Sequence, residues 1–200
     1  VTAATGIDAM VHAIEAYTSK LKKNFYSDLL AKHALILLSD NITKVIEDGS
    51  DMSARQNMLL GSSLAGQAFA NAPVAAIHAL AYPLGGHFHI PHGLSNALVL
   101  LPVLRVNSVV ASTEYSELLD CLPNTEPHRG TEVERAETFI QKLDDLIDQV
   151  GIPRRLSKLN INEQDLPILA KDAMLQQRLL INNPVEITEA RALEIYQSVF

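Results

Sequence analysis

The sequence predicts an all-α domain, and three observations carry this prediction. Apolar residues recur at spacings of three and four in most long segments, while alternating β-branched stretches are few. Capping residues and helix-ending glycines and prolines fall at the ends of these segments. The chain has 200 residues, of which 48% are hydrophobic, and a chain of this size can bury a core of its own. We therefore expect residues 1–200 to form a single helical bundle.

The first two elements are long helices. Thr5 has the form of an N-terminal cap, because the acidic Asp8 follows three places later, and it would open a helix that runs toward Ser19. An apolar stripe over residues 29–45 indicates a second helix, which the Asp-Gly-Ser segment of residues 48–50 would end.

The next two helices differ in length. A third helix is expected from about residue 51 to residue 70, where many small side chains permit close approach to a neighbouring helix. Pro73 and Pro83 bracket a shorter fourth helix. Residues 84–93, which hold three glycines and three histidines, are expected to leave that helix as a loop rich in possible metal ligands.

The second half of the chain continues the helical pattern. An apolar helix is expected over residues 94–106 and an amphipathic one over residues 132–150, with a polar connector at residues 123–130 between them. Asn162 and Thr188 each precede a glutamate, and they are expected to cap two further helices, the second of which reaches the end of the chain.

Composition argues against several classes of partner. The net charge is −7, from 23 acidic and 16 basic residues, whereas nucleic-acid binding needs concentrated Lys and Arg. Cys121 is the only cysteine, so a cysteine-based metal cluster is excluded and a reducing, cytoplasmic setting is expected. No apolar run is expected to reach the ~18–20 residues that cross a bilayer. The first residue is not Met, and a helix signal follows at once, so we expect residues upstream of this segment.

Four side chains are candidate ligands of one metal ion. Asp8 and His12 are four positions apart, so they project from one face of a helix. Taken alone, this pair is more typical of a helix cap and a polar neighbour than of two metal ligands. His78 lies on an apolar helix, and His92 follows fourteen positions later across a glycine-rich turn. Three imidazoles and a carboxylate suit Fe(II), Zn or Ni better than Mg or Ca, and the donor types alone do not separate iron from zinc.

Two other functions are compatible with a helical domain that carries His and Asp. A metal-dependent helical hydrolase would act on phosphate esters through an activated water, but the adjacent His-Asp pair expected of such a phosphohydrolase is absent from the sequence. A non-catalytic helical interaction module would use the histidines only for packing. Stoichiometric metal would distinguish these alternatives.

Three segments resemble the signature regions of the iron-containing (group III) alcohol dehydrogenases. These segments are residues 6–17 (GIDAMVHAIEAY), 78–86 (HALAYPLGG) and 91–97 (PHGLSNA). Further matches are Leu101-Pro102, Asn107, Asn183-Pro184, Thr188 and Ile195-Tyr196. The resemblance spans almost the whole chain. It implies the helical C-terminal domain of the dehydroquinate synthase-like, iron-containing alcohol dehydrogenase fold.

The resemblance also implies an enzyme of about twice this length, which interconverts a primary alcohol and an aldehyde as a homodimer. In that family an N-terminal α/β domain binds NAD(H) or NADP(H), and this domain is expected to be absent from residues 1–200. None of the nine glycines forms the G-x-G-x-x-G fingerprint of dinucleotide binding. The isolated chain is therefore not expected to turn over alcohol.

Residue by residue, the resemblance places Asp8, His12, His78 and His92 on the four ligand positions of the family. Related zinc-dependent glycerol dehydrogenases lack a histidine at the position of His12, so its presence favours Fe(II), with Zn(II) as the alternative. Glu15 is close enough in sequence to support a ligand, but a position facing solvent is expected for it.

The sequence departs from the family at one position. Several relatives carry a second histidine four places after the third ligand, and here that position is Tyr82. Tyr82 is a candidate for hydrogen bonding to substrate or cofactor, with aromatic packing as the alternative. His89, together with the neighbouring His87, is a candidate for the proton transfer that the missing family histidine would perform, with a surface position as the alternative.

Overall fold

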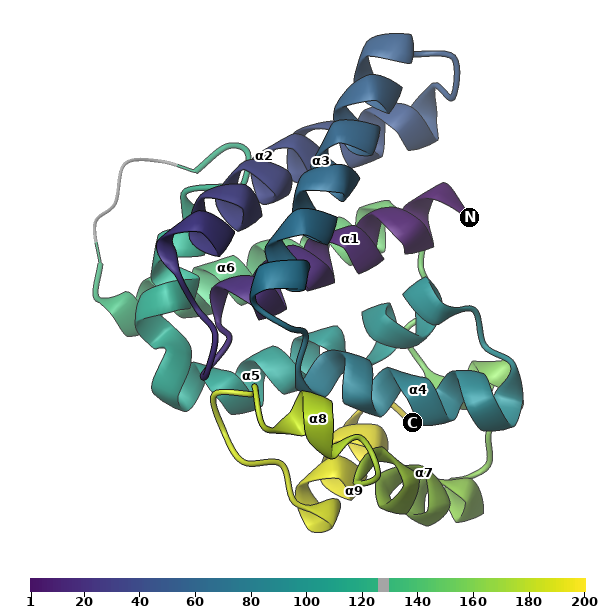
Figure 1. Ribbon diagram of the computed structural model, residues 1–200. Coiled ribbons are helices and arrows are strands. Elements are labelled where there is room, and N and C mark those ends of the chain that lie inside the picture. The colour runs from purple at the N-terminus through teal and green to yellow at the C-terminus, as the bar shows by residue number, and fades with distance from the viewer. Residues whose placement is uncertain (126–129) are drawn as a thin grey trace.

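The computed structural model describes residues 1–125 and 130–200, and its architecture is all-α, as expected (Figure 1). In this part of the chain every regular element is a helix. The longer helices are α1 (Thr2–Tyr17), α2 (Phe25–Glu47), α3 (Met52–Asn71), α4 (Ala76–Phe88), α5 (His92–Leu119), α6 (Glu132–Gln149), α7 (Leu166–Ala173) and α9 (Glu189–Ser198). Short turns are η1 (Leu156–Leu159), η2 (Glu163–Asp165) and α8 (Gln177–Leu180).

Helix α1 is the centre of the bundle. It packs against α2, α3 and α5, and its Ile7, Met10 and Ile14 are completely buried. These side chains recur every three or four residues, so they form one apolar stripe along the helix. The residues between them form a second stripe, which carries Asp8, His12 and Glu15 at positions i, i+4 and i+7.

The start of α1 differs from the sequence prediction. The helix begins at Thr2, with Val1 as its cap residue and no side-chain capping bond. Thr5 is an exposed residue inside the first turns, and its hydroxyl donates to the carbonyl of Thr2 at 3.2 Å. The prediction of Thr5 as a cap was wrong because the helix begins three residues before it.

Helices α2 and α3 lie side by side and cover α1 (Figure 1). Asn24 and Ser27 form a capping box at the start of α2, and Asp51 caps α3 through the backbone N–H of Ala54. The expected close approach of α3 is confirmed at Gly61, where a Cβ atom would lie 2.9 Å from Leu38 Cγ. A small residue is therefore required at this helix crossing.

Helix α4 extends further than the sequence predicted. Pro83 lies inside it, and the expected loop over residues 84–93 shrinks to residues 89–91. Proline removes one backbone hydrogen bond, but the burial of Leu80 and Leu84 on either side of it offsets this cost. The helix ends where His89 adopts a left-handed conformation, with φ 55°, and donates its N–H to the carbonyl of Gly85 at 3.0 Å.

Helix α5 also continues beyond its predicted end at residue 106. It passes through Pro102 and reaches Leu119, with a kink at Ala111 (φ −111°, ψ 23°). By length and composition α5 could cross a membrane, which was not expected from the apolar runs of the sequence. However, 61% of its most apolar stretch is buried within the fold, as in the core helix of a folded domain.

The remaining elements support α4 and α5. Helix α6 packs on α5 and begins at a capping box made by Thr131 and Glu134, close to the predicted boundaries. Thr188 caps α9 as predicted, whereas Asn162 precedes only the three-residue turn η2 and makes no side-chain capping bond to it. Helices α7 and α8 pack against α4 (Figure 1). The predicted connector over residues 123–130 lies partly outside the described residues.

Candidate metal centre

The candidate site lies where α1, α4 and α5 meet. Each helix brings two polar or aromatic side chains to it, four residues apart and therefore on one helix face. These pairs are Asp8 and His12 on α1, His78 and Tyr82 on α4, and His92 and Asn96 on α5.

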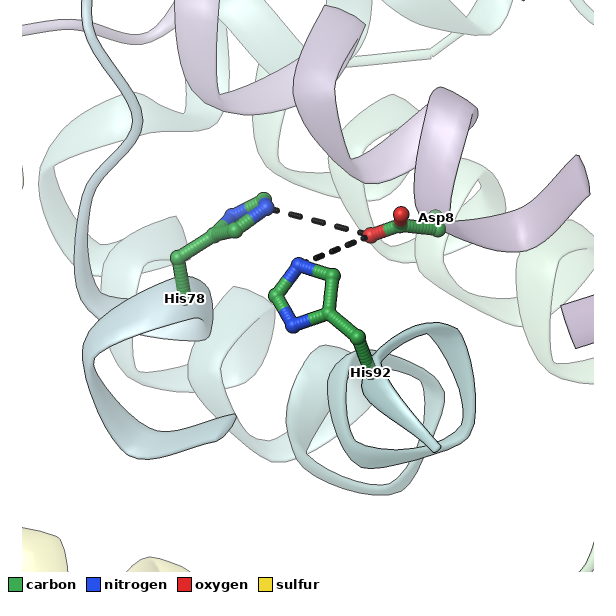
Figure 2. Close-up of side chains that lie close together, drawn as sticks. All are labelled: Asp8, His78 and His92. Atoms are coloured by element: carbon green, nitrogen blue, oxygen red, sulfur yellow. Dashed lines mark ion pairs between the residues drawn. The ribbon is translucent and has the colours of Figure 1, made fainter. Parts of the chain in front are cut away.

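Asp8, His78 and His92 point toward one another (Figure 2). Their ligand atoms all lie within 4.8 Å of one another. Asp8 Oδ1 is 3.8 Å from Nε2 of His78 and 3.7 Å from Nε2 of His92. Ligand atoms bound tetrahedrally to one ion at about 2.1 Å would be about 3.4 Å apart. The three side chains therefore already have almost the spacing of a first coordination shell.

His12 contributes a fourth donor atom. Its Nε2 lies 3.1 Å from Nε2 of His78. The Nδ1 atom of each ring has its own acceptor, which is the backbone carbonyl of Asp8 for His12 at 2.8 Å and Glu15 Oε2 for His78 at 2.6 Å. Protons held at both Nδ1 atoms leave two Nε2 lone pairs facing each other, an arrangement that a shared cation stabilises.

Burial differs among the four candidate ligands. The exposed fraction of the side chain is 2% for His78, about a fifth for Asp8 and His12, and 46% for His92. Burial, and next the charge of a protonated His78, lowers the pKa of His12. The Phe69 ring on α3 covers His12 at a centroid distance of 4.5 Å. The site therefore has a closed side around His78, which favours neutral imidazole at His12, and an open side at His92.

Glu15 does not face solvent, so that expectation was wrong. Its side chain is 3% exposed, and its two oxygens accept hydrogen bonds from His78 Nδ1 and from the backbone N–H of Ile77. Glu15 lies seven residues after Asp8, on the same face of α1. That spacing was the available signal for its place beside the ligands.

Asn96 is a site residue that the sequence reasoning missed. It is fully buried, and its Nδ2 donates to Asp8 Oδ1 at 2.5 Å. The same nitrogen lies 3.3 Å from His78 Nε2 and 3.2 Å from His92 Nε2. Within the described residues its Oδ1 has no hydrogen-bond partner. Its position four residues after His92 was the signal that could have identified it.

Gly93 allows α5 to begin directly against α1. A Cβ atom at this position would overlap the backbone of Ala4, at 2.8 Å from its carbonyl carbon, and would lie 3.2 Å from Asp8 Cβ. Only glycine permits this approach, because every other residue carries a Cβ. The distance between Asp8 and His92 therefore depends on Gly93.

The two candidate catalytic residues, Tyr82 and His89, lie in different surroundings. Tyr82 is half-buried, and its ring centroid is 5.9 Å from that of His92. His89 is exposed at the end of α4, and in the described part of the chain no hydrogen bond or ring contact joins it to the ligands. His87 pairs with Asp172 on α7 at 2.5 Å. Tyr82 thus lies at the site, whereas His87 and His89 lie outside it.

Comparison with known proteins decides the family. The C-terminal model of the Fe-containing alcohol dehydrogenase family matches residues 2–200. The chain belongs to this family.

The relatives of this alcohol dehydrogenase domain include the long-chain-alcohol dehydrogenase 1 of Geobacillus thermodenitrificans, which is 43% identical over 200 residues. The 1,3-propanediol dehydrogenase of Citrobacter freundii is 36% identical over 199 residues. Each alignment covers 100% of this chain, but only 50% and 51% of the respective relative. The chain therefore spans about half the length of these relatives.

Solved structures of the family have the same fold. A 1,3-propanediol oxidoreductase superposes with a TM-score of 0.94 at 34% identity, over 99% of this chain and 51% of that protein. An alcohol dehydrogenase from Oenococcus oeni superposes with a TM-score of 0.93 at 30% identity, over 100% and 51% respectively. The fold class predicted from the sequence, a helical C-terminal domain of this family, is confirmed.

Proposed function

We propose that this chain is the metal-binding part of an NAD- or NADP-dependent, iron-containing alcohol dehydrogenase that interconverts a primary alcohol and an aldehyde. The single observation that carries the proposal is the facing pair of imidazole nitrogens, His12 Nε2 and His78 Nε2, 3.1 Å apart beside the Asp8 carboxylate. Three imidazoles and one carboxylate are the donor set of an Fe(II) or Zn(II) site.

Asp8, His12, His78 and His92 would hold the ion. The Asp8 carboxylate offsets one charge of a divalent cation, and the three neutral imidazoles donate lone pairs to it, with no thiolate in the set. We propose Fe(II) as the resident ion and Zn(II) as the alternative, because a fourth protein ligand at His12 favours the iron branch. When bound, the ion supplies Lewis acidity for hydride transfer between the alcohol carbon and the nicotinamide.

The residues around the ligands have separate tasks. Glu15 and the Asp8 carbonyl orient two imidazoles, and Phe69 keeps water away from His12. The open side, where His92 is 46% exposed, is the side from which a small alcohol can enter. Tyr82 lies beside His92, and its hydroxyl can donate or accept a hydrogen bond there. We assign Tyr82 to positioning the substrate and leave His89 outside the site.

The nicotinamide nucleotide would be bound by another part of the enzyme. The relatives are twice as long as this chain, and the described residues form no nucleotide fingerprint. Their names refer to long-chain alcohols and 1,3-propanediol, which supports a small-molecule alcohol or aldehyde as substrate. A cytoplasmic homodimer completes the proposal. The free buried thiol of Cys121, the single cysteine, supports a reducing compartment, and the resemblance to the family supports the dimer. Analytical ultracentrifugation of the full-length enzyme tests the dimer.

Metal analysis tests the proposed centre. The chain is purified without chelator from iron-replete cells, and its iron and zinc contents are measured together with circular dichroism. One divalent ion per chain is expected, and His78→Ala or His92→Ala should remove it while the helical signal is retained. Wild-type protein that carries no metal under these conditions would overturn the proposal, and would favour a helical interaction module.

A second test concerns turnover. The isolated chain should show no NAD-linked or NADP-linked alcohol oxidation, because the nucleotide would have no binding domain. Measurable turnover, lost in His78→Ala, would show that this part of the proposal is wrong.

A further inference from the structure

Glu15 is an unusual residue in this core. Among the described residues it is the only Asp or Glu side chain that is buried, at 3% exposed. A carboxylate that leaves water loses several kcal/mol of hydration unless it is paired and hydrogen-bonded. The contacts of Glu15 should therefore show why the fold keeps it there.

Both oxygens of Glu15 have a partner on α4. Oε2 lies 2.6 Å from His78 Nδ1, and Oε1 accepts the backbone N–H of Ile77 at 2.7 Å. Ile77 is the second residue of α4, and the cap residue Ala75 makes no side-chain capping bond. Glu15 therefore satisfies a free N–H at the start of α4 from a different helix, where a negative charge is also favourable.

The bond to His78 controls the position of the ring proton. A carboxylate only accepts hydrogen bonds, so His78 must hold its proton at Nδ1. The lone pair of Nε2 is then directed to the side where Asp8 Oδ1 lies at 3.8 Å and His12 Nε2 at 3.1 Å. A ring with the proton at Nε2 would present an N–H to that side and could not bind a cation there.

We propose that Glu15 is the positioning residue of the centre. It fixes His78 in the tautomer that can accept a metal, and it joins the ligand to the first turn of α4, so that the orientation of the ring and the start of the helix depend on one carboxylate. The metal-related part of this role rests on the function proposed above. The tautomer itself is a property of the metal-free protein and is testable separately.

Glu15→Gln is the sharpest variant, because it keeps the size of the side chain and leaves one acceptor oxygen. The N–H of Ile77 can only donate, whereas His78 can move its proton. The glutamine oxygen is therefore expected to accept from Ile77, while the amide NH₂ donates to His78 Nδ1 and forces the proton to Nε2. The cap of α4 survives in this variant, but the acceptor tautomer is lost.

Two measurements follow from this reasoning. Long-range ¹H–¹⁵N NMR of metal-free protein reports which ring nitrogen is protonated, and the His78 signals are assigned by their loss in His78→Ala. We expect Nδ1–H in the wild type and Nε2–H in Glu15→Gln. Competition with a chromophoric chelator then measures Zn(II) affinity, which Glu15→Gln should lower by about 10–100-fold, the usual effect of losing a partner that orients a ligand.

Asn182→Ala is the matched control. Asn182 is buried, and its Nδ2 donates to the carbonyl of Val74 at 3.1 Å, so it supports the chain just before α4 without contacting a ligand. This variant should lower the thermal midpoint while leaving the His78 tautomer unchanged and Zn(II) affinity within about twofold of the wild type, since no partner that orients a ligand is lost.

Four outcomes would each overturn one of the two proposals. An Nε2–H tautomer in the wild type, or wild-type affinity in Glu15→Gln, would overturn the role of Glu15. An equal loss of affinity in Asn182→Ala would also overturn it, because general support of α4 would then explain the effect. Wild-type protein that binds no Zn(II) would overturn the proposed metal function instead, and the NMR comparison would still decide the role of Glu15.

Discussion

His78 and His92 would supply the same atom, Nε2, to the candidate centre, but their surroundings differ. His78 is 2% exposed and is held by Glu15, whereas His92 is 46% exposed and lies beside the rings of His78 and Tyr82 on α4, at centroid distances of 5.3 and 5.9 Å. The closed side is fixed by a buried polar network before anything binds. The open side is accessible to solvent, as the proposed entry of a small substrate requires.

This difference has an energetic consequence. Removal of one member of a buried charged pair leaves the other without compensation, which costs about 3–5 kcal/mol. A half-exposed side chain can keep water as its partner. Changes on the closed side should therefore affect both folding and metal binding, while changes on the open side should affect binding and reaction alone.

Gly93→Ala should have the largest effect on stability and metal binding together, because it moves His92, on the open side of the site, away from the ligands on the closed side. The new Cβ would overlap the Ala4 backbone, so the first turn of α5 must move away from α1 and carry His92 with it. Overpacking typically costs 1–3 kcal/mol and more where backbone must shift, so we expect a loss of about 3 kcal/mol in the free energy of unfolding. Urea denaturation measures this loss of stability. Zn(II) titration measures the loss of metal affinity expected when His92 moves away from Asp8.

Gly86→Ala is the control for that variant. Gly86 lies in α4, and a Cβ atom added there would meet no other atom within 4 Å, so alanine should stabilise the helix by about 0.5–1 kcal/mol. Equal behaviour of the two alanine variants would show that the contact between α5 and α1 does not set the site.

His78→Ala and His92→Ala compare the two sides directly. Both should abolish metal binding, but His78→Ala also leaves the Glu15 carboxylate without its imidazole partner. In metal-free protein we expect His78→Ala to lose about 3 kcal/mol of unfolding free energy, and His92→Ala less than about 1 kcal/mol, as is usual for exposed positions. Equal losses in urea denaturation would contradict the distinction between a closed and an open side.

Removal of the metal should give a somewhat smaller change. An ion present at about 100 times its Kd stabilises the folded state by about 2.7 kcal/mol. For a domain of this size, that corresponds to a fall of about 5–10 °C in the thermal midpoint when a chelator is added. Calorimetry should detect this shift in the wild type and not in His92→Ala. A chelator effect of the same size in His92→Ala would place the ion elsewhere.

Tyr82→Phe should have the smallest effect on the isolated chain. The Tyr82 ring lies beside the exposed His92, so loss of the hydroxyl should leave Zn(II) affinity and stability within error, while alcohol turnover by the full-length enzyme should fall. His89→Ala, outside the site, serves as the control and should change neither quantity. Unchanged turnover in Tyr82→Phe would leave Tyr82 with a packing role.

Much of this arrangement could be predicted from the sequence. The 3.6-residue period places Asp8 and His12 on one helix face, and the resemblance to iron-containing alcohol dehydrogenases added His78 and His92. The helical fold followed from the same periodicity. The fold is confirmed, and the candidate ligands lie close together, because each expectation depends on spacing along a single helix or on a motif that is continuous in the sequence. Metal binding by these four residues stays a prediction.

The remaining features depend on contacts between distant segments. Glu15 meets Ile77 and His78 more than sixty residues later. Its spacing from Asp8 places it on the ligand face of α1, but no local pattern shows that this face meets the start of α4. Pro83 was expected to end a helix, but burial of its neighbours outweighs the lost hydrogen bond. Tertiary packing determines both the contacts of Glu15 and the continuation of α4 through Pro83, and local propensity in the sequence does not reveal tertiary packing.

Anomalous diffraction tests the central claim most directly. Crystals of the chain loaded with Zn(II) would be measured above and below the zinc absorption edge. The proposal predicts one strong peak about 2.0–2.2 Å from a carboxylate oxygen of Asp8 and from Nε2 of His12, His78 and His92. A peak coordinated by other residues, or no peak at this position in metal-loaded crystals, would contradict it.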